Sequence, residues 1–297
     1  MLTLTRPEGA PATDFALTRR GIAAAFFTGY AAAALSAAAE PIHTDEAGLL
    51  VQTVAIASAE VALPAYLARP DARGRFPTVV VASEVFGLHE YIRDVCRRLA
   101  KLGYVAIAPA FFVRVGDPAP LTDLAAVIKI VAQASDQQVL GDIGATLDFL
   151  RKQPFVDRNR LAITGFCWGG GTTWLACEAF PAFRAGVAWY GRMVPPPGPA
   201  ADANRLWPVD GVARLRTPVL GLYGGRDPLS ASIPAMRAAL ATAHRVGSEI
   251  VVYPDAGHGF HADYRSSYNL VDAMDGWRRM LEFFARNGVG PKPYKPG

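Results

Sequence analysis

From residue 50 onward, short apolar runs alternate along the chain with longer segments whose apolar residues recur at helical spacing. The run Pro77–Ala82 is apolar and rich in β-branched residues, as expected of a strand that is buried on both faces of a sheet. The next segment, Glu90–Leu102, instead places its apolar residues on one helical face, and Gly103 ends it. Such an alternation predicts an α/β fold, in which helices cover both faces of a mostly parallel central sheet.

The same alternation continues toward the end of the chain. We expect a starting hairpin, a succession of single strands and a helix after most of them. The strands are expected at Thr53–Ala57, Val61–Ala68, Pro77–Ala82, Tyr104–Ala108, Arg160–Thr164, Ala185–Trp189, Pro218–Tyr223 and Glu249–Tyr253. The helices are expected at Glu90–Leu102, Asp136–Lys152, Gly170–Phe180, Ser232–Val246 and Tyr268–Asn287.

Two stretches interrupt this alternation, Phe112–Ser135 and the proline-rich Met193–Val212. We expect both to be loops over the carboxyl ends of the strands, which is the edge where ligands bind in such sheets. The sequence shows neither an internal repeat nor a linker. It therefore predicts a single domain over residues 40–297.

The first 39 residues have a different character. The pair Arg19-Arg20 precedes an uncharged, alanine-rich run, Ile22–Ala39, as in a bacterial twin-arginine export signal. This pattern predicts export to the periplasm and cleavage after the alanines. The alternative is a cytoplasmic protein that keeps an N-terminal helix. The run is too short and too rich in alanine for a stable membrane anchor.

The composition is that of a folded protein without a basic surface for nucleic acid. Of the 297 residues, 51% are hydrophobic and 19% are charged, which is too apolar for a disordered chain. The formal net charge is +4, but the Lys and Arg residues are scattered, whereas nucleic-acid binding needs a basic stripe. Three cysteines cannot form a disulfide framework, so at least one must be explained as a thiol.

The segment Gly165–Gly169, with the sequence GFCWG, lies between an expected strand and an expected helix. In such a sharp turn the central residue has a strained backbone, small residues on either side prevent clashes, and the central side chain projects above the sheet. The N–H group of Trp168 and the start of the helix then face a developing oxyanion. The spacing predicts that Cys167 is a nucleophile; the alternative is a structural cysteine in a tight glycine turn. Cys96 and Cys177 lie among apolar residues and are expected to be inert core thiols.

A thiol nucleophile needs a base, and the base needs a partner that fixes its tautomer. Of five histidines, His258 lies between two glycines just after the last expected strand. Asp227 follows the preceding strand, which gives the nucleophile–acid–histidine order of the α/β-hydrolase fold. The alternatives are a surface histidine and an aspartate that caps the next helix. His261 is a second candidate for the base, and His89 is expected to line the pocket or to cap its helix.

With these residues in place, the chain resembles the dienelactone hydrolase (carboxymethylenebutenolidase) family of α/β-hydrolases over roughly residues 50–287. A cysteine in the nucleophile turn, in place of serine, separates this family from most other α/β-hydrolases. The resemblance implies a hydrolase that opens a lactone or cleaves a carboxylic ester. It rests on Ser83–Leu88 with Ile92–Asp94, Gly165–Gly170, Tyr190-Gly191, Gly224–Asp227 and Ala256–Phe260.

The resemblance also gives a role to Glu84, at the end of the strand Pro77–Ala82. In the family this glutamate contacts the nucleophile thiol at rest, and once substrate displaces it, it helps to produce the thiolate. A thiol that stays neutral until then resists oxidation. The alternative is a loop carboxylate paired with Arg93 at the surface. The N–H groups of Val85 and Trp168 are expected to form the oxyanion hole.

The arginines depart from the family pattern. In the best-known members, the substrate carboxylate is held by one arginine in the loop before the nucleophile turn and another shortly after the catalytic histidine. Here Asp117–Gln138 contains only Lys129 as a basic residue, and Ala262 stands four positions after His258. The preferred substrate is therefore expected to differ. Three arginines are candidates for the missing contacts, namely Arg114, Arg192 and Arg265. The residues expected to line the substrate pocket are Phe86, Phe111, Tyr190, Arg192 and Phe260. For the aromatic residues among them, the alternative is packing in the core.

The expected reaction proceeds through a thioester acyl-enzyme on a small lactone or ester, in a monomer or homodimer. No metal or organic cofactor is expected, because the Cys and His residues lack metal-ligand spacing. One alternative is a general short-chain carboxylesterase without dienelactone activity, and another is a non-catalytic binding protein of the same fold. Redox chemistry at Cys167 is disfavoured, because no resolving cysteine lies nearby in the sequence.

Overall fold

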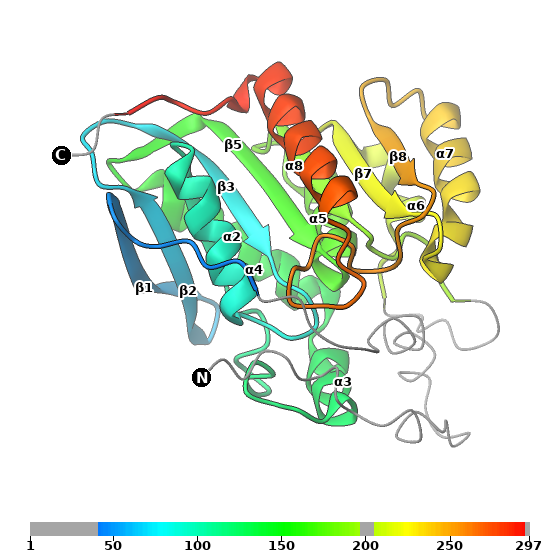
Figure 1. Cartoon of the computed structure of the whole chain (residues 1–297), viewed down its shortest axis with the longest axis horizontal. Helices are drawn as coiled ribbons and strands as arrows, with labels where there is room; N and C mark the ends of the chain where they lie inside the picture. The colour runs from blue at the N-terminus through cyan, green and yellow to red at the C-terminus, as the bar shows by residue number, and fades with distance from the viewer. Residues whose placement is uncertain (1–40, 197–204, 295–297) are drawn as a thin grey trace.

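The computed structural model describes residues 41–196 and 205–294 (Figure 1). The predicted export signal lies outside the described residues, as does part of the proline-rich stretch. Within the described residues, no helix has the length and apolar character needed to cross a membrane.

One eight-stranded sheet forms the centre of the molecule, in the order β1-β2-β4-β3-β5-β6-β7-β8. Strands β1 and β2 form an antiparallel hairpin, and β2 also runs antiparallel to β4, while the pairs from β4 to β8 are parallel. The predicted mostly parallel α/β-hydrolase sheet is thus confirmed. The strands are β1 (Leu49–Ser58), β2 (Val61–Pro70), β3 (Phe76–Ala82), β4 (Val105–Pro109), β5 (Val156–Phe166), β6 (Ala185–Trp189), β7 (Val219–Gly224) and β8 (Glu249–Tyr253).

Helices cover both faces of this sheet. In Figure 1, α2 and α8 lie in front of the strands, and α4 and α5 lie behind them. Four strands between the two layers, β3, β4, β6 and β7, are buried at every residue. The helices are α2 (Glu90–Lys101), α3 (Leu124–Gln133), α4 (Asp136–Arg151), α5 (Trp168–Ala179), α6 (Pro208–Gly211), α7 (Ile233–Thr242) and α8 (Leu270–Phe284), with short turns at Val212–Arg214, Pro228–Ser232 and Ala285–Val289.

The stretch Phe112–Ser135 was expected to be a loop, because it interrupts the alternation of strands and helices, but it is not a continuous loop. It contains α3, whose first turn is capped by the Asp123 side chain, which accepts a hydrogen bond from the N–H of Ala125. The helix buries Leu124, Val127 and Val131, which lie on one face. A capping residue and an apolar face were therefore both present in the sequence of this stretch.

One carboxylate is buried within the helix layer behind the sheet. The side chain of Glu178, in α5, is only 2% exposed, and neither carboxyl oxygen has a hydrogen-bond partner among the described residues. Its closest ion-pair contact is Arg214, at 3.8 Å. Burial raises the pKa of Glu178 to about 8, because a charged carboxylate loses hydration there.

We expect Glu178→Gln to stabilise the protein in alkaline solution. Because the pKa is higher in the folded than in the unfolded state, the protonated carboxyl stabilises the fold at pH 5, and this contribution is lost as the pH rises through about 8. At pH 9 the melting temperature of Glu178→Gln should exceed that of the wild type by roughly 3–6 °C. The two proteins should melt alike at pH 5. The exposed Glu60→Gln serves as the control, and an equal shift at both pH values would contradict the burial argument.

Candidate active site

The nucleophile turn has the strained geometry that its sequence predicts. Strand β5 ends at Phe166 and α5 begins at Trp168, which leaves Cys167 alone between them with φ 57° and ψ −116°. Few residues other than glycine adopt a positive φ, and in a folded protein such strain clusters at functional sites. The first N–H groups of α5 have no partner within the helix, so the positive end of the helix faces the region above Cys167.

The two glycines that flank this turn allow a very close approach of backbone to backbone. A Cβ atom on Gly165 would lie 2.1 Å from the carbonyl oxygen of Gly169. A Cβ atom on Gly169 would lie 2.3 Å from the carbonyl oxygen of Ala82, at the end of β3. The start of α5 is therefore packed directly against the end of the neighbouring strand.

This contact places two chemical groups at the same edge of the sheet. Strands β3 and β5 are adjacent and parallel, with Ala82 paired to Gly165, so the residues that follow each strand emerge side by side. The chain passes from β3 to β4 on one side and then returns to β5 on the other, which creates a topological switch point. Glu84 and Cys167 lie just beyond this point.

The candidate base and its candidate orienting carboxylate come from the next strand ends. Asp227 follows β7, His258 follows β8, and the His258 Nδ1 lies 2.7 Å from the Asp227 Oδ2. The other carboxylate oxygen of Asp227 accepts a hydrogen bond of 2.9 Å from the N–H of Leu229. Asp227 therefore caps the following turn and holds the histidine at the same time, so both interpretations of this residue are present in the structure.

His258 also lies against Cys167. Burial disfavours its charged ring, but the charges of Asp227 and Cys167 and their hydrogen bonds outweigh burial and raise the pKa of His258 to about 10. Its ring packs 5.1 Å from the ring of Tyr190, whose φ of 40° is also positive. The side chains of Cys167 and His258 are buried, so they meet in a largely dry site.

Glu84 is buried completely, and three residues contact its carboxylate. Tyr264 donates a hydrogen bond of 2.5 Å to Oε2, and the His89 Nε2 lies 3.2 Å from the same oxygen. The Arg265 guanidinium lies 3.4 Å from Oε1. Burial alone would raise the pKa of Glu84, but Arg265, His89 and Tyr264 lower it to about 2, so this carboxyl group is ionised.

The alternative partner of Glu84 was Arg93, and the structure places it elsewhere. Arg93 is exposed on α2, and its guanidinium lies over the ring of Tyr66 at 5.9 Å. His89 occupies the N-cap position of α2, but its side chain makes no capping hydrogen bond. The expectation that His89 caps the helix is therefore wrong, because its ring faces Glu84 instead.

The three candidate arginines differ in where they lie. Arg114 forms a bidentate ion pair with Asp142, at 2.8 and 2.9 Å. Arg192 lines a cavity of about 30 Å³ that also borders Trp168. Arg265 contacts a residue of the predicted site, because its guanidinium lies 3.4 Å from Glu84.

The remaining histidine and cysteine candidates lie in the core. His261 is 2.7 Å from the Tyr91 hydroxyl and stacks against Phe166, and burial holds its pKa well below the usual range. Such a histidine stays neutral and is not paired with Asp227. Cys96 and Cys177 are buried, and burial raises the pKa of each thiol. The structure thus groups Cys167 with His258 and not with these residues.

The aromatic residues of the expected pocket pack against Trp168 and other residues of the site. The ring of Phe111 packs 6.0 Å from that of Trp168, and the ring of Phe260 packs 5.4 Å from that of Tyr190. Phe86 packs against Arg265, whose guanidinium lies 5.1 Å from the ring centre. All of these aromatic side chains are buried, so each also belongs to the core.

A further cavity of about 170 Å³ borders the segment after Glu84 and Val85, with Gly87, Leu88 and Phe112 in its lining. Sequence reasoning missed Tyr264 and Tyr91, because no motif spacing singles out either residue.

Within the described residues, no group of His, Cys, Asp and Glu is arranged to hold a metal ion.

A strained cysteine turn after β5, an aspartate after β7 and a histidine after β8 lie at the strand ends of an α/β-hydrolase fold. The sequence model of the dienelactone hydrolase family matches residues 63–288, so the chain belongs to that family. It is accordingly a dienelactone hydrolase-like enzyme, a hydrolase of lactone or ester bonds.

The chain is similar to proteins named "putative carboxymethylenebutenolidase" from two bacteria. The protein of Methylorubrum extorquens is 46% identical over 287 residues, which cover 94% of this chain and 96% of the relative. That of Salmonella typhimurium is 46% identical over 265 residues, which cover 88% and 96%. A crystal structure described as a putative dienelactone hydrolase, from Klebsiella pneumoniae, is 44% identical and superimposes with a TM-score of 0.74 over 80% of this chain and 99% of that one.

We expect Gly169→Ala to destabilise the protein by about 3 kcal/mol or more, because the added methyl would meet the backbone of β3 and not a flexible side chain. Chemical denaturation measures this loss, and a loss of ester hydrolysis should accompany it. The matched control is Gly141→Ala in α4, where a Cβ atom meets nothing within 4 Å. That change should stabilise the helix by up to about 1 kcal/mol. Equal stabilities of the two variants would contradict the close packing of α5 on β3.

Proposed function

We propose that the protein cleaves a lactone or an activated carboxylic ester through a thioester on Cys167. The observation that carries the proposal is the meeting of Cys167, at a strained turn, with the His258–Asp227 pair. The ionised Glu84 at the neighbouring strand end supports the same mechanism. A buried structural cysteine would need neither a strained backbone nor an imidazole partner.

In the first half of the reaction, the thiol of Cys167 loses its proton and the thiolate attacks the substrate carbonyl carbon. The N–H groups of Val85 and Trp168 stabilise the oxyanion that forms. The carbon–oxygen bond of the lactone or ester then breaks, and the leaving oxygen takes a proton from the His258 imidazolium. The acyl group is left on sulfur as a thioester.

In the second half, neutral His258 removes a proton from a water molecule, and the water oxygen attacks the thioester carbonyl. The carbon–sulfur bond breaks, the acid product leaves, and the thiolate takes its proton back from Glu84, which restores the resting thiol and the Glu84 carboxylate. Asp227 holds the ring so that Nε2 faces the reacting atoms, because Nδ1 is engaged by the carboxylate. The group released from carbon in this half is a thiolate, which is a better leaving group than an alkoxide.

Glu84 serves as the acceptor of the thiol proton in this proposal. At rest its carboxylate is held by Tyr264, His89 and Arg265, which makes it a weak base. When bound substrate displaces Arg265 from Glu84, the desolvation of the buried carboxylate is no longer compensated, and its pKa rises. Glu84 then becomes basic enough to take the Cys167 proton only when substrate is present.

This proposal favours activated lactones and enol esters over amides, because an amide nitrogen leaves less readily than the thiolate. The names of the relatives point to the same class of substrate. A second candidate is a general short-chain carboxylesterase. The ion pair of Arg114 with Asp142 favours it, because that arginine is occupied away from Glu84 and Cys167. Rates with a dienelactone and with p-nitrophenyl acetate separate the two.

We also propose that residues 1–39 direct export to the periplasm, since Arg19-Arg20 precedes an uncharged alanine-rich run. Fractionation of the native bacterium, with mass spectrometry of the N-terminus, tests this. Enzyme that begins near residue 40 in the periplasmic fraction supports export. Enzyme that begins at Met1 in the cytoplasm contradicts it.

We expect Cys167→Ala to abolish turnover of p-nitrophenyl acetate, with a loss of at least about 10³-fold. His258→Ala should instead slow deacylation, so that intact-protein mass spectrometry detects an acyl adduct on Cys167. The matched control is Cys177→Ala, because Cys177 is a buried core thiol. Retention of wild-type turnover by Cys167→Ala would refute the nucleophile assignment.

We expect Asp227→Asn to lower kcat/KM by roughly 10²–10⁴-fold at pH 7, by analogy with loss of the orienting carboxylate in Ser-His-Asp enzymes. Without the carboxylate charge, the pKa of His258 should fall from its value of about 10, because burial lowers this pKa and Asp227 is the main group that opposes burial. NMR titration of the His258 ring measures that fall. An unchanged titration would contradict the coupling of the two groups.

A further inference from the structure

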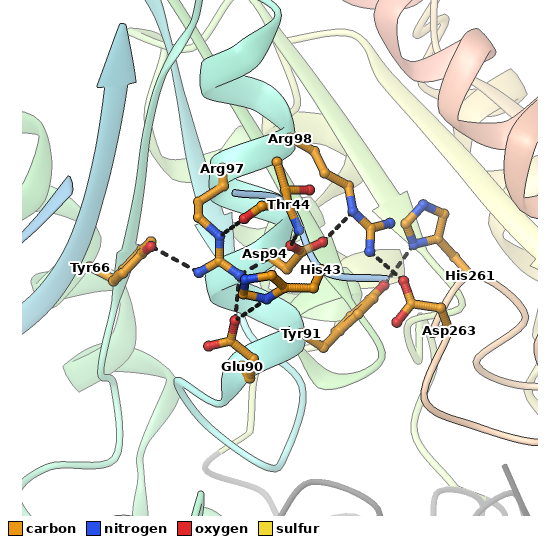
Figure 2. Close-up of polar contacts among 10 residues, drawn as sticks. All are labelled: His43, Thr44, Tyr66, Glu90, Tyr91, Asp94, Arg97, Arg98, His261 and Asp263. Atoms are coloured by element: carbon orange, nitrogen blue, oxygen red, sulfur yellow. Dashed lines mark hydrogen bonds and ion pairs between the residues drawn. The ribbon is translucent and has the colours of Figure 1, made fainter. Parts of the chain in front are cut away.

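A buried ionic network on α2 lies beside the catalytic residues but contains none of them. Asp94, Arg97 and Arg98 project from one side of this helix, and their partners come from three other parts of the chain (Figure 2). One of these parts is the segment of residues 42–47, named here the N-terminal strap. The proposed reaction uses neither the network nor the strap.

The strap is held through its backbone. The N–H of Thr44 donates a hydrogen bond of 2.5 Å to the Asp94 Oδ1, and the Thr44 carbonyl accepts one of 2.7 Å from the Arg97 Nε. The side chains of Asp94 and Arg97 are 1% and 4% exposed. Two buried, charged groups of α2 are thus partly satisfied by the backbone N–H and carbonyl of a single strap residue, Thr44.

The rest of the strap makes more exposed contacts with the same helix. Lys101 donates to the Asp45 carboxylate at 2.6 Å and to the Ala47 carbonyl at 2.7 Å. His43 lies 3.6 Å from Glu90, which is also paired with Arg97. Exposed pairs of this kind contribute little, so the bonds to Thr44 are the ones that fix the strap.

Arg98 links Asp94, which binds the strap, to Asp263, which lies next to the active-site residue Tyr264 in the sequence. Its Nε donates a hydrogen bond of 2.5 Å to the Asp94 Oδ2, and its terminal nitrogen donates to Asp263. Asp94 and Asp263 are each 1% exposed, so Arg98 bridges two buried carboxylates (Figure 2). Burial raises the pKa of Asp263, whereas Arg98 and the backbone N–H of Ile42 act to lower it.

Asp263 immediately precedes two of the residues that hold Glu84. Tyr264 donates a hydrogen bond to one carboxylate oxygen of Glu84, and Arg265 pairs with the other. The Arg265 Nε in turn donates to the Tyr264 hydroxyl at 3.2 Å, which ties the two side chains together. A shift of Asp263 therefore moves the groups that set the position and the charge of Glu84.

We propose that the N-terminal strap, acting through Asp94, Arg98 and Asp263, positions Tyr264 and Arg265 and thereby Glu84. Arg98 is in this view a positioning residue, since it touches no reacting atom. The proposal rests on the role of Glu84 proposed above. It makes the strap a functional part of the enzyme. It also predicts that a substitution of Arg98, which is more than 160 residues from Asp263 in the sequence, alters the position of Tyr264 and Arg265 and thereby the reactivity of Glu84.

The sharpest test removes the backbone N–H of Thr44. Thr44→Pro in the full chain lacks the N–H that Asp94 binds, whereas the control Thr44→Ala keeps it. We expect Thr44→Pro to lower kcat for p-nitrophenyl acetate by about tenfold, with KM within twofold, and Thr44→Ala to match the wild type. The rate of Cys167 alkylation by iodoacetamide should change by at least about threefold in Thr44→Pro alone.

A second pair of variants tests the bridge itself. Arg98→Met removes both ion pairs, whereas Arg98→Lys can restore one of them. We expect kcat to fall about tenfold or more in Arg98→Met and to recover in part in Arg98→Lys. The melting temperature is measured on every variant. A kcat that stays at the wild-type level in folded Arg98→Met overturns the proposal.

Combining Thr44→Pro with Glu84→Gln separates positioning from simple destabilisation. If the strap acts through Glu84, Thr44→Pro causes no further loss of kcat in the Glu84→Gln protein. An equal loss in both backgrounds overturns the proposal, and so does a Thr44→Pro protein that matches Thr44→Ala while Glu84→Gln is slow. Wild-type kcat in Glu84→Gln contradicts the role of Glu84 itself, and with it the present proposal.

Discussion

The pairing of β3 with β5 is the constraint on which the rest of the site depends. Because Ala82 lies opposite Gly165, the chain segments that leave the two strands start at the same level of the sheet. The helix after β5 can begin there only if its second residue has no side chain, since Gly169 faces the carbonyl of Ala82. This contact fixes where α5 begins, and so fixes the strained backbone of Cys167. The strain is thus supported by packing across two strands.

Around that fixed point, the charges are arranged in two separate groups. His258 and Asp227 form one ion pair beside the thiol, and Glu84 lies in a second group with Tyr264, His89 and Arg265. In each group burial opposes the charged form and neighbouring charges restore it. Loss of a single partner therefore changes a pKa strongly, which suits groups that must gain and lose protons during a reaction. The same sensitivity makes both groups dependent on the accuracy of the surrounding fold.

The strands and the predicted nucleophile, acid and base could be located from the sequence, because each depends on local information. β-branched runs mark the strands, and glycines at fixed spacing mark the turn at Cys167. The helix α3 was missed because it lies between a segment that contains Pro118 and Pro120 and a short connection to α4. Its capping residue, Asp123, and the apolar face of the helix are nevertheless visible in the sequence. The partners of Glu84 were not predictable in this way: Tyr264 is 180 positions away, and only the folded loop after β8 brings it close. The bonds to the backbone of Thr44 leave no trace in residue type at all.

The two hydrogen bonds of Asp227 have a consequence for how this fold can vary. One oxygen closes the turn at Leu229 while the other holds His258, so a single rigid group joins the start of a loop to the base. An insertion between Asp227 and Leu229 would rotate the carboxylate away from the imidazole. An insertion beyond Leu229 would leave its orientation unchanged. Added segments that reshape the entrance for new substrates are therefore confined, in this connection, to positions after Leu229.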